Sequence, residues 1–218
     1  MVNIEDISRI PIFTGLSQEE LQQIQQHCRL TLEHSRKGRD LAMEYTKSDK
    51  LICVIDGWVE AVTYSDDRAY RMEELIEGPL MLEPDKLFGM TRSYRSSYRT
   101  HNVCSLISIS KEYLMWIFDN YLVVRLNYLN LICHKAQQQE KMMWKKNTQS
   151  YEQRVIQFIK RRCIYPNGHK MLYIKMSQMA EEINASRQDV SNVLNKLDDD
   201  EKIILKRGIV DIPNIQLL

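Results

Sequence analysis

The sequence has no apolar run that approaches the ~20 residues a membrane-spanning helix requires. Its first residues, MVNIEDISRI, lack the apolar core of a signal peptide. We therefore expect a cytoplasmic protein with no membrane partner. The five cysteines show no C-x-x-C spacing, which argues against a disulfide framework and against a zinc or iron–sulfur site. They are expected to be buried apolar residues, and no metal site is predicted.

The sequence also lacks strong charge and the common catalytic motifs. Its net charge of +1 is not typical of a protein that binds polyanions over its whole surface, so any DNA binding depends on local patches such as Lys160–Arg162 and Lys206–Arg207. There is no P-loop, no nucleophile elbow and no H-E-x-x-H motif, and we predict that the protein is not an enzyme. A chain of 218 residues is long enough for two domains.

What the sequence does contain is a pattern of two short amphipathic helices in residues 174–197. Asn184 lies between them, where a residue that tolerates a left-handed backbone is needed, and Ser186 is a good N-cap for the second helix. The side chains expected to point outward are of types that read base edges; they are Arg187, Gln188, Ser191, Asn192 and Lys196. The pattern predicts a helix-turn-helix, with an ordinary helical hairpin that has a solvated polar face as the alternative.

Strand patterns on both sides of this helix pair favour the helix-turn-helix. Residues 202–212 read KIILKRGIVDI, which predicts a β-hairpin with Arg207-Gly208 at its tip, and Met171–Ile174 reads as a short strand. This order is that of a winged helix-turn-helix, expected over residues 147–218. Lys206 and Arg207 at the hairpin tip would suit contacts to DNA phosphates.

The region from residue 32 to residue 109 has many short alternating runs separated by turn residues. Leu51–Ile55 and Trp58–Tyr64 are predicted strands because they are rich in β-branched and aromatic residues. This pattern predicts a sandwich or barrel. A helix is predicted before it, starting from the capping box of Ser17 and Glu20.

A long helix is predicted after the β region, over about residues 119–146, which would end a first domain of residues 1–146. One stripe of the helix follows heptad spacing, although Glu140 also falls on it. The predicted dimer seam consists of Leu122, Leu126, Leu129, Cys133, Ala136 and Met143. We expect a homodimer paired along this seam; the alternative is that the stripe packs on the β domain. Residues 147–150 are a predicted hinge.

Taken in order, these parts resemble the cAMP receptor protein/FNR (CRP/FNR) superfamily of bacterial transcription regulators. IPIFTGLSQEEL is similar to the family's opening helix, LICVIDGWVEA to its I-x-x-G-x-V strand turn, and ASRQDVSNVLNKLDDDEKI to its recognition helix. The resemblance implies an α+β chain with an N-terminal cyclic-nucleotide-binding-like β-roll (jelly roll), a long dimerisation helix and a C-terminal winged helix-turn-helix. It also implies a homodimer that places one recognition helix in each of two successive major grooves, roughly 34 Å apart on a near-palindromic DNA site. RNA polymerase is a further implied partner.

The resemblance assigns roles to three residues of the second helix. Arg187 falls on the family's position for an arginine that reads guanine. Gln188 stands where the family often has Glu, and Asn192 where it often has a second Arg. Since Gln and Asn favour adenine, this chain is expected to read a half-site different from the family's usual one.

The family's effector pocket has a pattern like F-G-E-L followed by R-S-A, in which a Glu binds a ribose hydroxyl and an Arg binds a phosphate. The most similar segment here is Phe88-Gly89-Met90 followed by Arg95-Ser96-Ser97, with Met90 in place of the Glu. Aligning Gly78-Pro79 with the family's Gly-Glu puts proline at the acidic position. Both registers lose the ribose contact, so cAMP is not the expected effector.

The remaining interpretations of the sequence concern cofactors and DNA binding. Histidines and cysteines such as His27, His34, His101, Cys53 and Cys104 are of the types that ligate haem, but scattered residues of this kind are usually structural, and no cofactor is predicted. The leading prediction is a DNA-binding regulator with an unidentified effector. The alternatives are a cAMP-responsive regulator, and an interaction protein on the same fold that has lost DNA binding.

Overall fold

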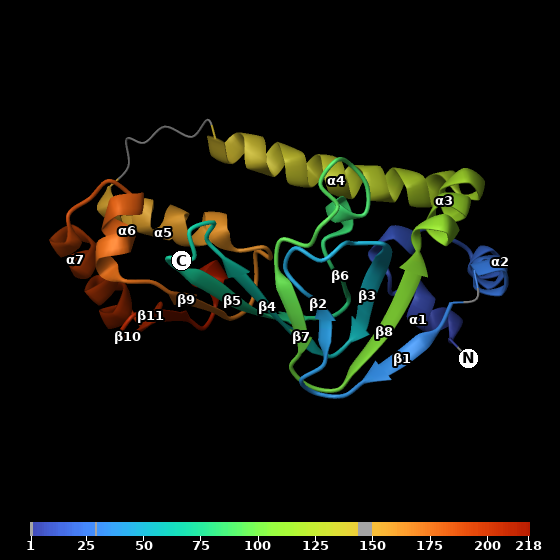
Figure 1. Cartoon of the computed structure of the whole chain (residues 1–218), viewed down its shortest axis with the longest axis horizontal. Helices are drawn as coiled ribbons and strands as arrows, with labels where there is room; N and C mark the ends of the chain where they lie inside the picture. Colours follow the sequence, from blue (N-terminus) through green and yellow to red (C-terminus); the bar gives the residue numbers. More distant parts are fainter. Residues whose placement is uncertain (1, 29, 144–149) are drawn as a thin grey trace. The chain divides into compact units, whose positions relative to one another are not determined.

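The structure is a computed structural model that describes residues 2–28, 30–143 and 150–218 (Figure 1). It consists of two compact units. Unit 1 comprises Met1–Val59 and Glu77–Lys141, and unit 2 comprises Glu60–Ile76 and Met142–Leu218. This differs from the expected division at residue 147 in one main respect, because Glu60–Ile76 was expected in the N-terminal domain. Of the predicted hinge, residues 147–149 lie outside the described residues.

Unit 1 has helices on both sides of its strand region in sequence. Its helical elements are α1 (Ile4–Ser8), η1 (Pro11–Phe13), α2 (Gln18–Cys28), η2 (Pro84–Lys86), α3 (Lys111–Asn120) and α4 (Leu122–Met143), which ends just past the boundary of the unit. Its strands are β1 (Leu32–Ser35), β2 (Asp40–Ala42), β3 (Lys50–Asp56), β6 (Leu80–Met81), β7 (Ser97–Thr100) and β8 (Cys104–Ser110). One antiparallel sheet has the order β1-β8-β3-β6, and β2 pairs with β7.

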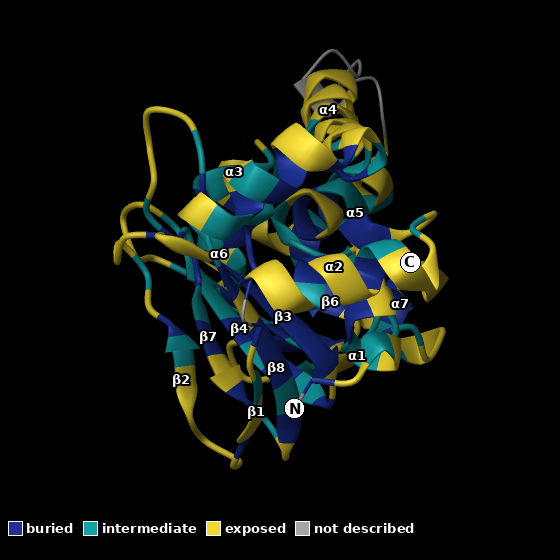
Figure 2. Ribbon diagram, turned by 90° about the vertical axis from the view of Figure 1, so that its right-hand side faces the viewer, coloured by how far each residue is buried: buried dark blue, intermediate teal, exposed yellow. Residues whose placement is uncertain are grey.

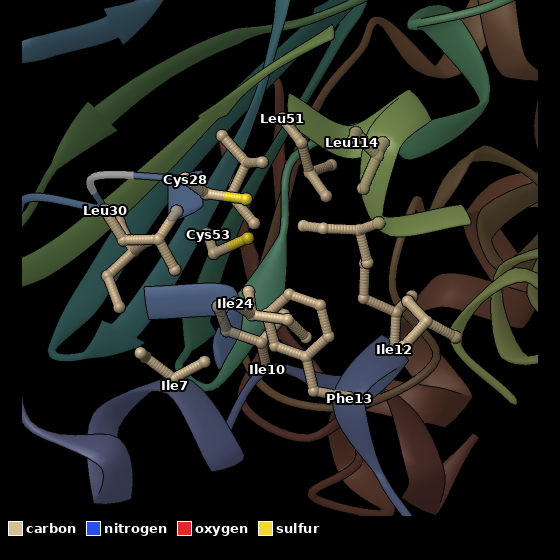
Figure 3. Close-up of a cluster of buried hydrophobic side chains, with 14 of the residues drawn as sticks. Ile7, Ile10, Ile12, Phe13, Ile24, Cys28, Leu30, Leu51, Cys53 and Leu114 are labelled. Carbon is tan, nitrogen blue, oxygen red and sulfur yellow. The ribbon is translucent and has the colours of Figure 1, made fainter. Parts of the chain in front are cut away.

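The core of unit 1 forms where α1 and α2 pack with the sheet (Figure 3). Five consecutive residues of β3 are buried, so this strand has apolar neighbours on both faces. Cys28 and Cys53 lie in this core, as expected for apolar thiols. Each fully buried aliphatic side chain stabilises the fold by about 1.5–3 kcal/mol. The capping box predicted at Ser17 is present, since the Glu20 carboxylate accepts from the Ser17 N–H at 2.7 Å.

The predicted long helix is two helices, because the backbone is extended at Tyr121. The Tyr121 N–H still donates to the Ile117 carbonyl at 2.8 Å, and its buried ring joins the core of unit 1. Burial of one aromatic ring at the junction therefore sets where α4 begins, at Leu122 rather than near residue 119.

Unit 2 contains the predicted winged helix-turn-helix. Its elements are α5 (Tyr151–Arg162), β9 (Lys170–Tyr173), α6 (Met176–Glu182), α7 (Arg187–Asp199), β10 (Ile204–Lys206), β11 (Ile209–Ile212) and η3 (Ile215–Leu217). The strands β9, β11 and β10 pair in that order, and all these pairs are antiparallel. The core consists of apolar residues of α5, α6, α7 and the sheet, and Leu172, Val190 and Leu197 have no exposed surface.

A hairpin from the β region extends this sheet beyond β9 (Figure 1). Its strands are β4 (Trp58–Tyr64) and β5 (Arg71–Glu77), and β5 pairs antiparallel with β9 on the side opposite to β11. Met72 of β5 is 2% exposed and lies in the same core as α5 and α7. The grouping of β5 with unit 2 follows from its pairing with β9 and from the place of Met72 in the core of that unit.

Candidate DNA-binding surface and sensor site

The turn between α6 and α7 has the geometry of a tight helix-turn-helix. Asn184 has φ 51°, in the left-handed region, and the Ala185 N–H returns to the Ala180 carbonyl at 2.9 Å. The Ser186 hydroxyl accepts from the Asp189 N–H at 3.1 Å, while the Asp189 carboxylate accepts from the Ser186 N–H at 3.2 Å. These reciprocal bonds satisfy free donors at the start of α7. The start and direction of α7 are thus set by local hydrogen bonds.

The first turns of α7 present polar side chains to solvent. Arg187, Gln188 and Asn192 are exposed, and Ser191 is half-buried, while Val190 and Leu194 on the opposite face are buried. The Gln188 side-chain amide donates to the Asn192 side-chain carbonyl at 2.9 Å. This bond holds two of the predicted base-reading groups side by side. The surface of α7 therefore carries a rigid group of donors and acceptors next to one cation.

Lys196, also predicted to contact DNA, has a protein partner. Its ammonium lies 2.7 Å from the Glu152 carboxylate on α5. The hydrogen bond to Glu152 raises the pKa of Lys196. Because Glu152 already balances this charge, Lys196 adds little positive potential to the surface of α7.

At the hairpin tip, one of the two predicted DNA-contacting cations has an acidic partner and the other is exposed. The Lys206 ammonium lies 2.8 Å from the Asp211 carboxylate, which also lies 2.7 Å from His169. Burial acts to raise the pKa of Asp211, but its hydrogen bonds to Lys206 and His169 hold the pKa below its usual value. Arg207 is exposed at the tip beside Gly208, whose φ is 73°. Of the two, Arg207 is better placed to contact a phosphate.

The basic residues at the end of α5 have structural roles that the sequence did not indicate. The Arg162 guanidinium lies over the Phe158 ring, donates to the Tyr70 hydroxyl at 2.7 Å and pairs with Glu182 at 2.6 Å. Arg154, earlier on the same helix, donates to the carbonyls of residues 183 and 184 at the end of α6. These arginines line a cavity of about 430 Å³ between α5 and the end of α6. They hold α5 against α6, so the patch 160–162 is in part a structural element.

The predicted dimer seam leaves apolar side chains uncovered on α4 (Figure 2). The exposed fractions are 57% for Leu122, 47% for Leu126 and 49% for Leu129. Cys133 and Ala136 are exposed further along the helix. Met143 is the last residue of α4, but its side chain lies outside the part that the structure describes. The expectation that every cysteine is buried is wrong for Cys133, which lies on this uncovered stripe, and Cys163 is only half-buried.

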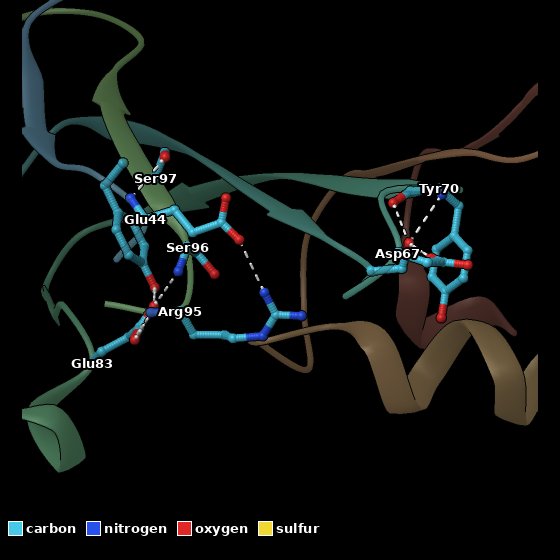
Figure 4. Close-up of polar contacts among 9 residues, drawn as sticks. Glu44, Asp67, Tyr70, Glu83, Arg95, Ser96 and Ser97 are labelled. Carbon is cyan, nitrogen blue, oxygen red and sulfur yellow. Dashed lines mark hydrogen bonds and ion pairs between the residues drawn. The ribbon is translucent and has the colours of Figure 1, made fainter. Parts of the chain in front are cut away.

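The predicted effector residues divide into two groups. Phe88 packs against Phe118 and Tyr128, with ring centroids 6.2 and 5.8 Å away, and Gly89 has no neighbour within reach of an added Cβ. The backbone N–H groups of Arg95 and Ser96 instead bind Glu83 (Figure 4).

Ser97 is separate again, since its hydroxyl accepts from the Glu44 N–H at 3.0 Å. The acidic partner of Arg95 and Ser96 is therefore Glu83, and the two registers based on Met90 and Pro79 overlooked it. Its signal in the sequence was an acidic residue five positions after Gly78, in Gly-Pro-Leu-Met-Leu-Glu.

The residues considered for haem have other surroundings. The His27 ring stacks on Trp116 with centroids 3.6 Å apart, and His34 lies 3.2 Å from the Ser105 hydroxyl. Burial raises the pKa of the Cys53 and Cys104 thiols. Over residues 2–28, 30–143 and 150–218, no three histidine, cysteine or acidic side chains cluster as metal ligands would. No helix in the described part of the chain is long and apolar enough to cross a membrane.

Comparison with solved structures identifies the fold. No protein-family model and no curated protein sequence matches the chain. The catabolite activator protein of Thermus thermophilus is similar over 93% of this chain and 93% of its own, with a TM-score of 0.53 and 17% identity. A transcriptional regulator of Thermotoga maritima is similar over 57% of this chain and 95% of its own, with a TM-score of 0.50 and 13% identity. The chain shares the fold of the catabolite activator protein, so the expected arrangement of a β-sheet domain and helices is confirmed.

Proposed function

We propose that this chain, which has a CRP/FNR-type fold, is a sequence-specific DNA-binding transcription regulator and not an enzyme. The observation that carries the proposal is the surface of α7. A capped helix anchored by buried Val190 and Leu194 presents Arg187, Gln188 and Asn192 to solvent. A helix in this position of a winged helix-turn-helix enters the major groove by its first turns.

The chemistry of these side chains suggests which bases are read. Arg187 can donate two hydrogen bonds to guanine O6 and N7. Gln188 and Asn192 can each pair with adenine N6 and N7, and their mutual hydrogen bond keeps their amides in register in the absence of DNA. Arg207 on the hairpin tip would add a phosphate contact that positions the domain without reading sequence.

The uncovered leucines of α4 support a homodimer. Leu122, Leu126 and Leu129 are each about half exposed, and their spacing is that of a heptad seam. A second copy that covered this stripe would remove three large apolar side chains from water. Two copies related by a two-fold axis present two α7 helices, which suits a near-palindromic site with half-sites roughly 34 Å apart. RNA polymerase is the protein partner that such a regulator would contact at a promoter.

The test is selection of bound duplexes from a random pool, followed by titration of the selected site and of random DNA at several salt concentrations. We expect Arg187→Ala to cost about 1–3 kcal/mol on the selected site and much less on random DNA. Arg36→Ala, which removes an exposed arginine of unit 1, is the matched control and should leave the ratio of the two affinities unchanged.

Equal losses on both DNAs would reduce Arg187 to a phosphate contact. Failure of the unmodified protein to enrich any duplex would overturn the proposal, and would favour an interaction protein on the same fold. Titration at low salt also distinguishes weak binding from an absence of binding, because phosphate contacts weaken steeply as salt rises.

A further inference from the structure

Glu83 of unit 1 is a buried carboxylate in an unusual backbone conformation. Its φ of 35° and ψ of 60° place it in the left-handed region, where a side chain with a Cβ is strained. Only 4% of the residue is exposed. A buried acidic residue in a strained conformation persists only where its surroundings bind it well.

Both oxygens of the Glu83 carboxylate accept hydrogen bonds from one short segment (Figure 4). The Arg95 N–H donates to Oε2 at 2.7 Å, and the Ser96 N–H donates to Oε1 at 3.0 Å. The Tyr98 hydroxyl also donates to Oε1, at 3.0 Å. Two successive backbone N–H groups that converge on one anion form a concave oxyanion site.

The walls of this site are closed to solvent. Ser96 is fully buried and Tyr98 is 1% exposed. The Arg95 guanidinium reaches the Glu44 carboxylate, with Nη1 3.2 Å from Oε1, so it has an acidic partner outside the site. Two backbone amides and one phenol thus donate to Glu83, and such donors favour an anion by geometry and dipole.

We propose that Arg95, Ser96 and Tyr98 form an oxyanion site for a carboxylate, and that Glu83 is its built-in ligand. The chain fills the site itself, so the donors of the site are satisfied without an external anion. An external anion can bind here only when the Glu83 side chain is absent or displaced. Removal of that side chain takes this acceptor away from the N–H groups of Arg95 and Ser96, and we expect a small planar carboxylate such as formate to replace it.

The residues after Glu83 link this site to α4. The Tyr128 hydroxyl donates to the Pro84 carbonyl at 2.6 Å, and the Lys135 ammonium lies 2.7 Å from the Asp85 carboxylate. Glu83 is thus held by the oxyanion site, while the next two residues, Pro84 and Asp85, are held by α4. Occupancy of the site therefore fixes the turn on which the middle of α4 rests. That α4 is a dimer helix rests on the proposed function, whereas the oxyanion site does not.

The experiment compares thermal unfolding of the full chain and of three variants in sodium formate and in sodium chloride of equal ionic strength. Glu83→Ala opens the site, Glu83→Gln fills it with a neutral group of the same size, and Glu19→Ala removes an exposed carboxylate of α2 as the control. We expect Glu83→Ala to lower Tm by about 5–10 °C, because buried donors lose their acceptor. Formate should then raise the Tm of this variant alone by about 2–5 °C.

The proposal is overturned if Glu83→Ala has the same Tm as the unmodified protein, or if formate raises the Tm of all four proteins equally. If Glu83→Ala does not fold, hydrogen exchange of Glu83→Gln decides. Faster exchange of the amides of Arg95 and Ser96 than in the unmodified protein supports the site, and unchanged exchange overturns it. These readouts involve no DNA, so the proposed regulator function can fail while the oxyanion site stands.

Discussion

The ion pair between Glu74 and Lys170 offers the sharpest test of how the β4–β5 hairpin joins unit 2. Neither side chain has any exposed surface, and Nζ lies 2.8 Å from Oε2. The Glu74 carboxylate also accepts from the N–H groups of Ile164 and Tyr165, at 2.6 and 3.2 Å. The Glu74 carboxylate of β5 therefore balances the charge of a lysine on β9 and accepts hydrogen bonds from the segment that follows α5.

Removing one partner of a buried pair costs about 3–5 kcal/mol, because the remaining charge is left uncompensated. We expect Glu74→Ala to fall in this range or above it, since it also removes the acceptor of two part-buried N–H groups. Lys170→Met should cost about 3 kcal/mol, because the same N–H groups still hold the Glu74 carboxylate. The double variant Glu74→Gln with Lys170→Met leaves no buried charge and keeps an acceptor, so it should lie within about 1.5 kcal/mol of the unmodified protein.

The measurement is urea unfolding followed by hydrogen exchange of peptides from β5 and β9, with β8 of unit 1 as the internal reference. Glu77→Ala, at the exposed end of β5, is the control and should change the free energy of unfolding by less than about 0.5 kcal/mol. The reasoning is refuted if Glu74→Ala resembles this control. It is also refuted if the double variant is as unstable as the sum of the Glu74→Gln and Lys170→Met single variants, because the pair would then carry no coupling energy.

Three further predictions concern α4 and α7. Leu126→Asp with Leu129→Asp should convert the dimer to a monomer in light scattering, while Asn130→Asp, which adds a charge at an exposed polar site of the same helix, should not. Diamide should link two chains through Cys133, which is the exposed cysteine of the described residues. The other four thiols should react less, since burial raises the pKa of Cys28 to about 11 and of Cys163 to about 12 and also raises those of Cys53 and Cys104. A linked dimer that persists in Cys133→Ser on a non-reducing gel would contradict the seam. Ser186→Ala should cost about 1 kcal/mol in urea unfolding through loss of the N-cap, and an unchanged midpoint would show that α7 does not depend on its capping box.

Local signals were sufficient for much of the fold. The capping boxes at Ser17 and Ser186 start helices where the sequence predicts them, and Asn184 takes the left-handed conformation expected at the turn. Trp58–Tyr64 has the bounds predicted for it. These features depend on residues a few positions apart, whose hydrogen bonds and periodicity can be read from the chain directly.

The partners of polar groups could not be read in this way. Lys196 and Lys206 were both predicted as DNA contacts from their types, yet each has an acidic partner in the structure. Glu152 is 44 residues from Lys196 in sequence, and no periodic pattern connects them. A residue's type indicates what it can bind, whereas the folded chain determines which partner is within reach.

The sequence by itself determined the order of the two domains and the polar face of α7, because short-range spacing encodes both. Only the tertiary structure decided that β5 pairs with β9 and that Glu83 occupies the site formed by Arg95 and Ser96. A β-strand exposes the same backbone donors and acceptors to any neighbour, so its pattern does not specify the partner. Burial of Glu74 on β5 and of Glu83 favoured both arrangements, since carboxylates withdrawn from water are stable only where several donors converge on them.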